Sequence, residues 1–169
     1  PGLKVVCPST PRDAKGPLLS SIRSDDPVIF LEPKPIYRRA VGEVPDGDYE
    51  TPLGEARTVR EGDDVTLIAW GAMVPLCGEV ATRLAGEGIE CALIDPRTLW
   101  PLDIDAIVSS VQGTGRCVIV HEAPRSCGFG AEIATLVQQR CFLHLEAPVL
   151  RVTGYDTPFP YTLEFAYLP

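Results

Sequence analysis

Short apolar runs rich in β-branched residues alternate with amphipathic stretches from residue 65 onward. The four apolar runs, which predict strands, lie at 65–70, 91–94, 117–120 and 149–152. The three amphipathic stretches, which predict helices, lie at 74–84, 103–111 and 130–142. Because the apolar runs recur every roughly 25 to 32 residues with a helix between them, the pattern indicates successive βαβ units. We therefore predict an α/β domain with a largely parallel sheet and helices on both faces.

The first third of the chain has a different pattern. Residues 3–7 read like the end of a strand, and Ser9 or Thr10 can cap a helix that has Pro11 at its first position. This helix should end near residue 23, before a short strand at 28–31. One helix between two strands cannot close a core alone, so we expect this part to pack against the side of the later domain. We also expect further sequence before residue 1.

Residues 32–56 read as a connector, because proline, glycine and charged residues follow one another without a helical or strand period. Ile36, Tyr37 and Tyr49 can anchor it, so we predict an ordered strap more than a flexible tether. The expected organisation is a first part at 1–34, a linker at 35–56 and a second domain at 57–169.

Composition and charge exclude two classes of partner. The chain is 45% hydrophobic and 22% charged, which is typical of a soluble globular protein. No apolar run approaches the ~20 residues that a membrane-spanning helix needs. Fifteen Lys and Arg against 23 Asp and Glu give a net charge of −8, which repels phosphate backbones. We therefore expect no membrane and no nucleic acid, and favour a basic protein partner.

The cysteines indicate a reducing compartment. They are few, show no Cys-x-x-Cys spacing, and in several cases fall within apolar runs, so we predict buried free thiols. The six are Cys7, Cys77, Cys91, Cys117, Cys127 and Cys141. Cys127 differs because it lies in a glycine-containing turn before a predicted helix. With two histidines in all, the sequence offers little from which to build a zinc site.

A candidate site follows the apolar run at 117–120. We predict that this strand stops at His121 and Glu122 and turns through glycines into the next helix, at the edge where open α/β sheets place their ligands. The glycines at 128 and 130 form only half of a dinucleotide-binding fingerprint, because Ile133 occupies the third small position. A phosphate-binding P-loop and a Gly-x-Ser-x-Gly elbow are also absent from the sequence.

Three runs in order carry a resemblance to a known family. They read DPRTLWPLD at 95–103, HEAPR followed by GFGAEI at 121–133, and GYDTPFP at 154–160. Together they resemble the C-terminal half of the β subunit of thiamine-diphosphate-dependent 2-oxo acid dehydrogenases. The LEAP run at 145–148 looks most similar to the branched-chain, 2-oxoisovalerate type. The pyruvate and acetoin types remain open as alternatives.

The resemblance implies a transketolase C-terminal-type domain preceded by the tail of a pyrimidine-binding domain. It implies an α₂β₂ assembly with an α subunit and a second β subunit, which decarboxylates branched-chain 2-oxo acids and acylates lipoyl groups. Thiamine diphosphate and Mg²⁺ would belong to the full assembly, since the family's β-subunit glutamate and histidine precede residue 1. This segment would serve subunit assembly and docking of the dihydrolipoyl acyltransferase, without catalytic or cofactor-binding residues of its own, and we expect it to be inactive alone. The family's C-terminal helix would also be missing.

The resemblance also assigns residues to contacts. It implies interface roles for residues on three loops or strand ends, namely Arg97, His121, Glu122, Arg125 and Asp156. Some family members hold a structural monovalent cation, and the matching positions here are Ser21, Ser24 and Asp26. The compartment would be the bacterial cytoplasm or the mitochondrial matrix. A stand-alone protein-binding module without catalysis is the second class of function that the sequence leaves open.

Overall fold

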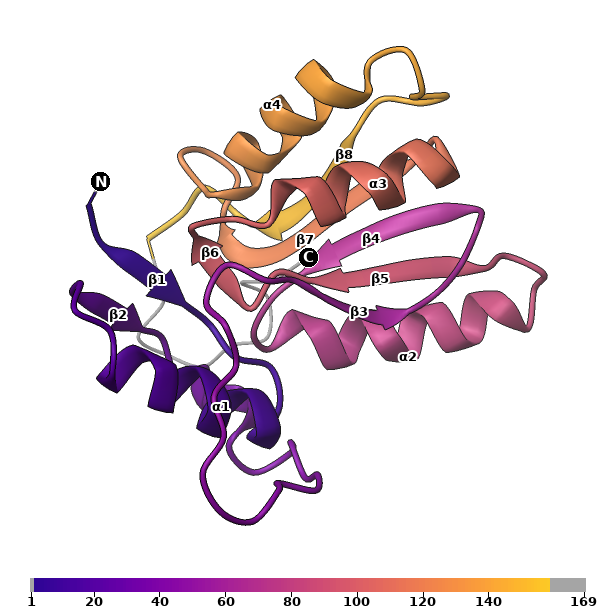
Figure 1. The fold of residues 1–169 in the computed structure, drawn as a ribbon. Coiled ribbons are helices and arrows are strands. Elements are labelled where there is room, and N and C mark those ends of the chain that lie inside the picture. The colour runs from indigo at the N-terminus through magenta and orange to yellow at the C-terminus, as the bar shows by residue number, and fades with distance from the viewer. Residues whose placement is uncertain (1, 159–169) are drawn as a thin grey trace.

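The computed structural model describes residues 2–158, which form two sheets and the helices that cover them (Figure 1). The strands are β1 (Lys4–Val6), β2 (Val28–Phe30), β3 (Arg57–Arg60), β4 (Val65–Ala69), β5 (Cys91–Asp95), β6 (Thr98–Trp100), β7 (Cys117–Pro124) and β8 (Leu150–Gly154). The helices are α1 (Pro11–Ile22), α2 (Met73–Ala85), α3 (Ile104–Thr114) and α4 (Gly130–Cys141), with a short 3₁₀ turn η1 (Lys34–Ile36). Residues 159 and 160 of the third family run lie outside the described residues.

The larger sheet has five strands in the order β3-β5-β4-β7-β8. β4 pairs in parallel with β5 and β7, and β7 pairs in parallel with β8, whereas β3 is antiparallel to β5. In Figure 1, α2 covers one face of this sheet and α3 and α4 cover the other. The predicted α/β domain with a largely parallel sheet and helices on both faces is confirmed.

The two cores of this domain follow from the alternation of side chains along its strands. On β4, Ile68 packs into the core beneath α3 and α4, while Leu67 and Ala69 pack beneath α2. Both faces are therefore buried, which explains why apolar residues occupy most consecutive positions of these strands. None of the helices among residues 2–158 has the length and apolar character needed to cross a membrane.

The smaller sheet joins the beginning of the chain to the later domain. β1 pairs in parallel with β2, and α1 connects the two strands. The third strand, β6, pairs antiparallel with β1, although it lies more than 90 positions further along the chain. The first part of the chain therefore packs against the later domain, as expected, and also shares a sheet with it.

The connector is ordered along α1, as predicted. Arg23 forms ion pairs of 2.6 Å with both Asp48 and Glu50, and the Thr51 amide donates to Ser20 Oγ at 3.2 Å. Because these contacts lie near the C-terminal end of α1, they hold the strap against that helix. The connector also contains the turn η1, which the proline-rich sequence did not predict.

Three strand assignments from the sequence need correction. β7 does not stop at His121 and Glu122, because it continues to Pro124 and pairs again with β8 after a register shift. β3 and β6 were not predicted, since they are short and contain charged or aromatic residues beside apolar ones. Both form by pairing with distant strands, so the local hydrophobic pattern carries little of the signal.

Candidate functional site

A cluster of charged residues around two buried acids lies where the two sheets meet. Asp13 comes from the first turn of α1, which Thr10 caps by accepting a hydrogen bond from the Asp13 amide at 3.1 Å. Asp95 is the last residue of β5, and the side chains of the two acids are 4% and 0% exposed. Arg57 and Arg97 complete the group, which we call the junction cluster.

The arginines of the junction cluster connect the two carboxylates. Arg57 Nη1 lies 3.0 Å from Asp13 Oδ2, and Arg97 Nη1 lies 3.3 Å from Asp13 Oδ1. Asp95 accepts hydrogen bonds from the Ser9 hydroxyl and from the Arg97 amide at 2.9 Å, and lies 4.0 Å from Arg57 Nη2. The cluster is balanced in charge, and it ties α1 and β5 to β3.

Burial raises the pKa of Asp95 to about 6, and the negative charge of Asp13 adds to this effect. The Ser9 hydrogen bond, the Arg97 amide and Arg57 act in the opposite direction because they favour the ionised form. Each carboxylate already has partners in the chain, so the junction cluster is built to hold the two parts together.

Arg97 is committed to contacts within the chain. It has a φ of 57°, and its Nη2 donates to the backbone oxygen of Glu55 at 2.9 Å, in addition to its ion pair with Asp13. Its side chain is 12% exposed. The structure therefore gives Arg97 a role at the junction, and its predicted role in subunit contact remains a prediction.

His121 is buried inside the chain and is not at an open edge. It is 2% exposed, and its ring stacks on Trp70 with a centroid distance of 5.2 Å and an interplanar angle of 14°. Neither ring nitrogen has a hydrogen-bond partner among residues 2–158. Burial, assisted by the charge of Arg151, lowers the pKa of His121, which favours the neutral ring.

Two glycines make room for this imidazole. A Cβ atom on Gly128 would lie 2.8 Å from His121 Cε1, and one on Gly130 would collide with Nε2. The HEAPR-x-x-GFG spacing is thus explained by packing, because the turn after β7 folds back over the ring and starts α4 against it. The His121 ring thus packs against this turn at Gly128 and Gly130.

The exposed candidates lie around this turn: Glu122 is in β7, Arg125 is in the turn, and Asp156 follows β8. Asp156 accepts hydrogen bonds from the amide and hydroxyl of Ser126, both at 2.8 Å, which lower its pKa. Arg151 donates to the backbone oxygen of Arg125 at 3.0 Å. Glu122 reaches solvent, although desolvation by its neighbours raises its pKa. The structure thus brings Arg125 and Asp156 together through Ser126 and leaves both on the surface.

The residues matched to a cation site lie at the end of α1. Ser21 Oγ donates to the Pro17 backbone oxygen, at 2.6 Å. The Lys4 ammonium lies 3.0 Å from Ser24 Oγ and 2.9 Å from Asp26 Oδ2. These side-chain oxygens are already engaged by the protein, which leaves backbone carbonyls as ligands for an ion. The cation therefore remains a prediction.

Among residues 2–158, no group of three or more His, Cys, Asp or Glu side chains is arranged to hold a metal ion. The two acids of the junction cluster are also neutralised by arginines, so these residues do not fit a diphosphate and magnesium site. We therefore derive no chemical step through thiamine diphosphate in this part of the chain.

Sequence reasoning missed most of the junction cluster and Trp70. Asp95 gave a usable signal, because an acid that directly follows a fully apolar strand must be paired or protonated once it is buried. Asp13 looked like an ordinary acid in the first turn of a helix, which is favourable there even in solvent. The pairing of Asp13 with Arg57 depends on the packing of α1, which the sequence pattern did not specify.

Comparison with known proteins places the chain in a family. The sequence model described as "Transketolase, C-terminal domain" matches residues 54–169. The chain is 60% identical, over 171 aligned positions, to the mitochondrial 2-oxoisovalerate dehydrogenase subunit beta of Dictyostelium discoideum, with 100% of the chain and 46% of that protein covered. It is 48% identical to the pyruvate dehydrogenase E1 component subunit beta of Staphylococcus epidermidis, with 100% of the chain and 52% of that protein covered.

A solved structure agrees with these matches. A chain described as "Split gene transketolase, inactive beta4 tetramer" superposes with a TM-score of 0.74 at 28% identity, covering 94% of this chain and 50% of that one. The chain spans about half the length of the curated relatives that it matches. It belongs to the transketolase C-terminal domain family, and its relatives include β subunits of 2-oxo acid dehydrogenases.

Proposed function

We propose that this chain is part of the β subunit of the decarboxylase component of a 2-oxo acid dehydrogenase complex. The observation that carries the proposal is the similarity over the full chain, with 60% identity to a 2-oxoisovalerate dehydrogenase β subunit. The identity of 48% to a pyruvate dehydrogenase β subunit is lower, which favours branched-chain 2-oxo acids as substrates. In the full assembly, thiamine diphosphate and Mg²⁺ would supply the decarboxylation chemistry.

We propose the same division of the chain as the sequence suggested, with residues 1–34 as the end of a pyrimidine-binding domain, 35–56 as a linker and 57–169 as the C-terminal domain. One face of the small sheet supports it. Lys4 contacts Ser24, and Phe30 lines a groove with Leu18, so these even-numbered strand residues face α1. The opposite, odd-numbered positions carry apolar residues with no helix of residues 2–158 packed over them.

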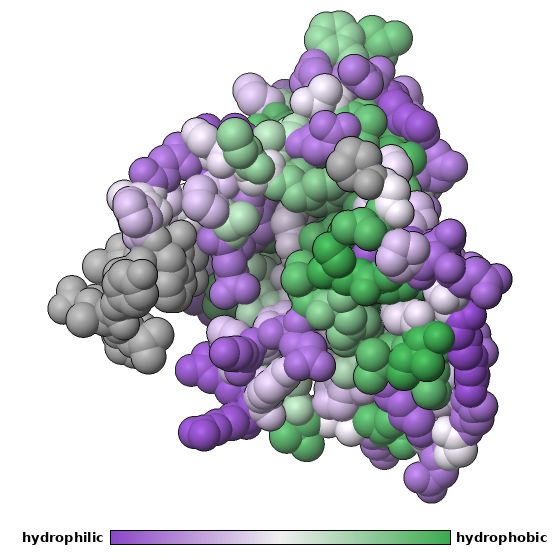
Figure 2. Space-filling view, turned by 90° about the vertical axis from the view of Figure 1, so that its left-hand side faces the viewer, coloured by the Kyte–Doolittle hydropathy of each residue, from purple (hydrophilic) through white to green (hydrophobic). Residues whose placement is uncertain are grey.

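This open face includes Ile29, which is 42% exposed, and Trp100, which pairs with Val5 and is 56% exposed. Leu3 and Leu31 continue it at 40% and 43% exposure. Figure 2 looks at the side of the molecule where β1, β2 and α1 lie and shows hydrophobic residues gathered across its middle. The pair of β1 and β2 is parallel, and parallel strands are normally covered on both faces, so the exposed apolar side chains support a missing layer contributed by the rest of a pyrimidine-binding domain.

For this segment we propose roles in subunit assembly and in docking of a dihydrolipoyl acyltransferase. The exposed surface formed by Glu122, Arg125 and Asp156 is the one that we assign to contacts with the α subunit and the second β subunit. A net charge of −8 supports attraction of a basic acyltransferase segment. Binding of a peripheral subunit-binding domain should then weaken steeply between low and high salt. Absence of binding at low salt would contradict the docking role.

The function is tested with the intact gene product and a 2-oxoisovalerate dehydrogenase α subunit. Co-expression should give a heterotetramer that decarboxylates 2-oxoisovalerate with a higher kcat/KM than pyruvate. A preference for pyruvate would favour the alternative substrate class. Residues 1–169 alone should neither bind thiamine diphosphate, as measured by calorimetry with Mg²⁺, nor turn over a 2-oxo acid when the α subunit is added. Binding of an acyltransferase without any α-subunit complex would favour a stand-alone binding module.

We also propose a bound monovalent cation and a compartment, both from the similarity to 2-oxo acid dehydrogenase β subunits. An ion at the carbonyls near Ser21, Ser24 and Asp26 would raise the Tm in KCl relative to choline chloride at equal ionic strength. An unchanged Tm would contradict the cation.

The relative from Dictyostelium discoideum is described as mitochondrial, and the six cysteines of this chain are free. Both observations support a matrix or bacterial cytoplasmic location.

A further inference from the structure

The imidazole of His121 is a titratable group that the proposed function does not use. Its ring stacks on Trp70 at a centroid distance of 5.2 Å, and the residue is 2% exposed. Both ring nitrogens are buried without a hydrogen-bond partner among residues 2–158. A proton on this ring would create a charge that has lost its hydration and gained no partner, so the folded chain holds the ring neutral.

The turn at 125–130 covers this ring. A Cβ atom on Gly128 would lie 2.8 Å from His121 Cε1, and one on Gly130 would collide with Nε2, so the backbone of the turn lies directly on the imidazole. In Figure 1 the turn joins the end of β7 to the start of α4. The first turn of α4 depends on it, because the Ala131 amide donates to the Gly128 carbonyl at 2.9 Å. A displacement of the turn would therefore expose the ring and break the first hydrogen bonds of α4.

The charge that faces the ring from the neighbouring strand is positive. Burial is the main cause that lowers the pKa of His121, and the charge of Arg151 on β8 adds to it. The backbone of Ala123 acts in the opposite direction. Trp70 and residues 128–130, which form the two walls around the ring, carry no charge. An imidazolium in this place would meet one repelling guanidinium and uncharged walls.

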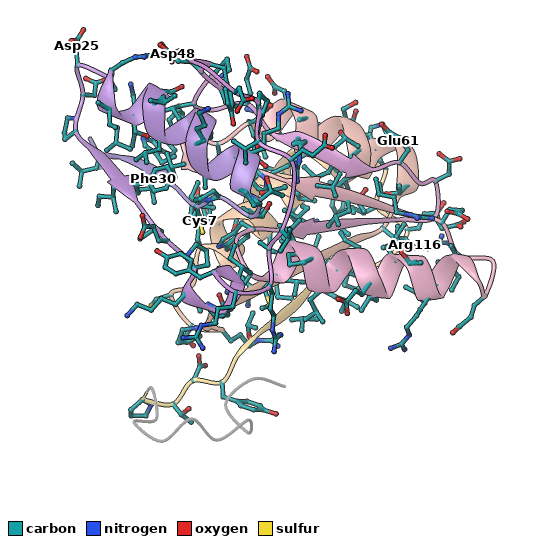
Figure 3. All side chains as sticks on the ribbon, turned by 90° about the horizontal axis from the view of Figure 1, so that it is seen from below. Cys7, Asp25, Phe30, Asp48, Glu61 and Arg116 are labelled. Carbon is teal, nitrogen blue, oxygen red and sulfur yellow. The ribbon has the colours of Figure 1, made fainter. Side chains whose placement is uncertain are left out.

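The carboxylates of the surrounding elements are directed elsewhere. Glu122 points to the opposite face of β7, where its charge adds to burial in raising the pKa of Cys7, which Figure 3 shows between the first part of the chain and the larger sheet. Asp156, which follows β8, is exposed and accepts two hydrogen bonds from Ser126. Glu132 is exposed on the first turn of α4. None of the three accepts a hydrogen bond from the ring, because both ring nitrogens are unpartnered within the described part of the chain.

We propose that residues 125–130 form a latch over His121 that opens when the ring takes up a proton. The charged ring would need water, and of its two walls the turn is the one that can move. Trp70 directly follows the buried strand β4. The turn is held from outside by exposed hydrogen bonds, such as those of Ser126 with Asp156.

Opening of the latch would change the exposed surface around it. Arg125 and Ser126 belong to the turn, so opening would separate Ser126 from Asp156 and displace a residue that we assign to subunit contacts. Cys127 favours the open form, because its φ of 59° is strained for a residue other than glycine. The latch is a property of this chain's own fold and does not depend on the assignment of subunit contacts.

The direction of the pH dependence follows from the two forms of the latch. In the open form the ring regains water and has the ordinary histidine pKa of 6.5, whereas its pKa in the closed form is lower. The open form therefore binds more protons below about pH 6.5, and the equilibrium shifts toward it as the pH falls. At higher pH the ring is neutral in both forms, and the latch stays closed.

Hydrogen–deuterium exchange of the intact gene product, read by mass spectrometry between pH 7.5 and 5.5, tests the latch. The amides of Ala131, Glu132 and Ile133 are the reporters, because they donate to carbonyls of the turn at 2.9–3.2 Å. After correction for the intrinsic pH dependence of exchange, their rate should rise by up to about tenfold as the pH falls between these limits. Amides within α3 are the internal control and should show no such rise.

Matched variants identify the group that takes up the proton. His121→Gln cannot take up a proton and should give a flat profile, while His144→Gln removes the exposed second histidine and should keep the rise. Arg151→Gln should reduce the rise, because the closed form then tolerates a charged ring better. Arg151→Lys retains the charge and should keep the rise. The two Arg151 variants test the latch even if circular dichroism shows that His121→Gln does not fold.

An unchanged exchange rate at the start of α4 in the wild type would overturn the proposal. A rise of equal size in α3 would also overturn it, because the chain would then loosen generally in acid. A rise that persists in His121→Gln, or that is the same in Arg151→Gln as in Arg151→Lys, would assign the effect to another titratable group.

Discussion

Asp13 of α1 and Arg57 of β3 meet at 3.0 Å, although the two residues belong to parts of the chain that the sequence separates by a connector. Asp13 is 4% exposed at its side chain and also contacts Arg97. The orientation of the first part of the chain against the larger sheet is therefore fixed by buried charge as well as by the pairing of β1 with β6.

Asp13→Asn should destabilise the fold more than any exposed ion-pair change. The substitution keeps the size of the side chain but leaves the guanidinium groups of Arg57 and Arg97 without their counter-charge. We expect a loss of about 3 kcal/mol in the free energy of unfolding, measured by urea denaturation. Asp105→Asn is the control, because its pair with Arg140 is exposed, and it should cost less than about 1 kcal/mol. Equal effects of the two changes would contradict a special role for the junction cluster.

The sequence pattern was sufficient for the parallel strands of the larger sheet, but not for its antiparallel edge strand β3 or for the junction. The strands β4, β5 and β7 are covered on both faces. Side chains on both faces must therefore be mainly apolar, and the sequence shows this directly as a run of mainly apolar residues in each strand. The strand β6 has three residues and one exposed tryptophan, and it becomes a strand because β1 supplies a partner. Pairing between distant segments is set by the tertiary fold, and a local pattern cannot encode it.

Asp95 should make stability depend on pH between about 4 and 6. Its pKa is raised by burial to about 6 in the folded chain, above the ordinary value of 3.8 that applies when unfolded. The folded state therefore binds more protons than the unfolded state in this range, and stability falls as the pH rises. Above pH 6 the cost of the buried charge is fully present, and below pH 4 it is absent.

The measurement compares wild type with Asp95→Asn by urea unfolding at pH 4, 5, 6 and 7. The stability of wild type relative to the variant should decline by on the order of 1–3 kcal/mol up to pH 6 and then level off. The acids and bases facing Asp95 are Asp13, Arg57 and Arg97, and they are unchanged in both proteins. A relative stability that rises with pH would show that the Asp95 pKa is lowered instead.

The candidate site at the end of β7 illustrates a second limit of sequence reasoning. His121 and Glu122 are neighbours in the sequence, but alternate residues of a strand point to opposite faces. The strand continues through both residues, so His121 packs inward against Trp70 while Glu122 reaches solvent. The sequence motif could be recognised. Which of its residues is buried and which is exposed, however, depends on where the strand ends.

Gly130→Ala should strain the packing of His121. The added methyl group would collide with Nε2, and Trp70 stacked on the ring limits its retreat. We expect a loss of about 1–3 kcal/mol in the free energy of unfolding. Gly113→Ala in α3 is the control, because no heavy atom lies within 4 Å of the position that its new methyl carbon would take, and it should be neutral or stabilising by about 0.5–1 kcal/mol.

A double-mutant cycle identifies the cause of the Gly130 effect. In a His121→Ala background the imidazole is gone, so Gly130→Ala should lose most of its cost. An undiminished cost in that background would assign the effect to the backbone of the turn instead.

Cys127 should be the single reactive thiol of the folded chain. The five other cysteines are buried, and burial raises the pKa of Cys7 and Cys117 to about 12 and that of Cys77 to about 11, which suppresses the reactive thiolate. An Ellman-type reagent should therefore release one equivalent per native chain and six after denaturation without reductant. Cys127→Ser should abolish the native reaction and leave the other five equivalents after denaturation. Release of two or more equivalents from the native protein would show that a buried strand or helix opens, and fewer than six after denaturation would reveal a disulfide.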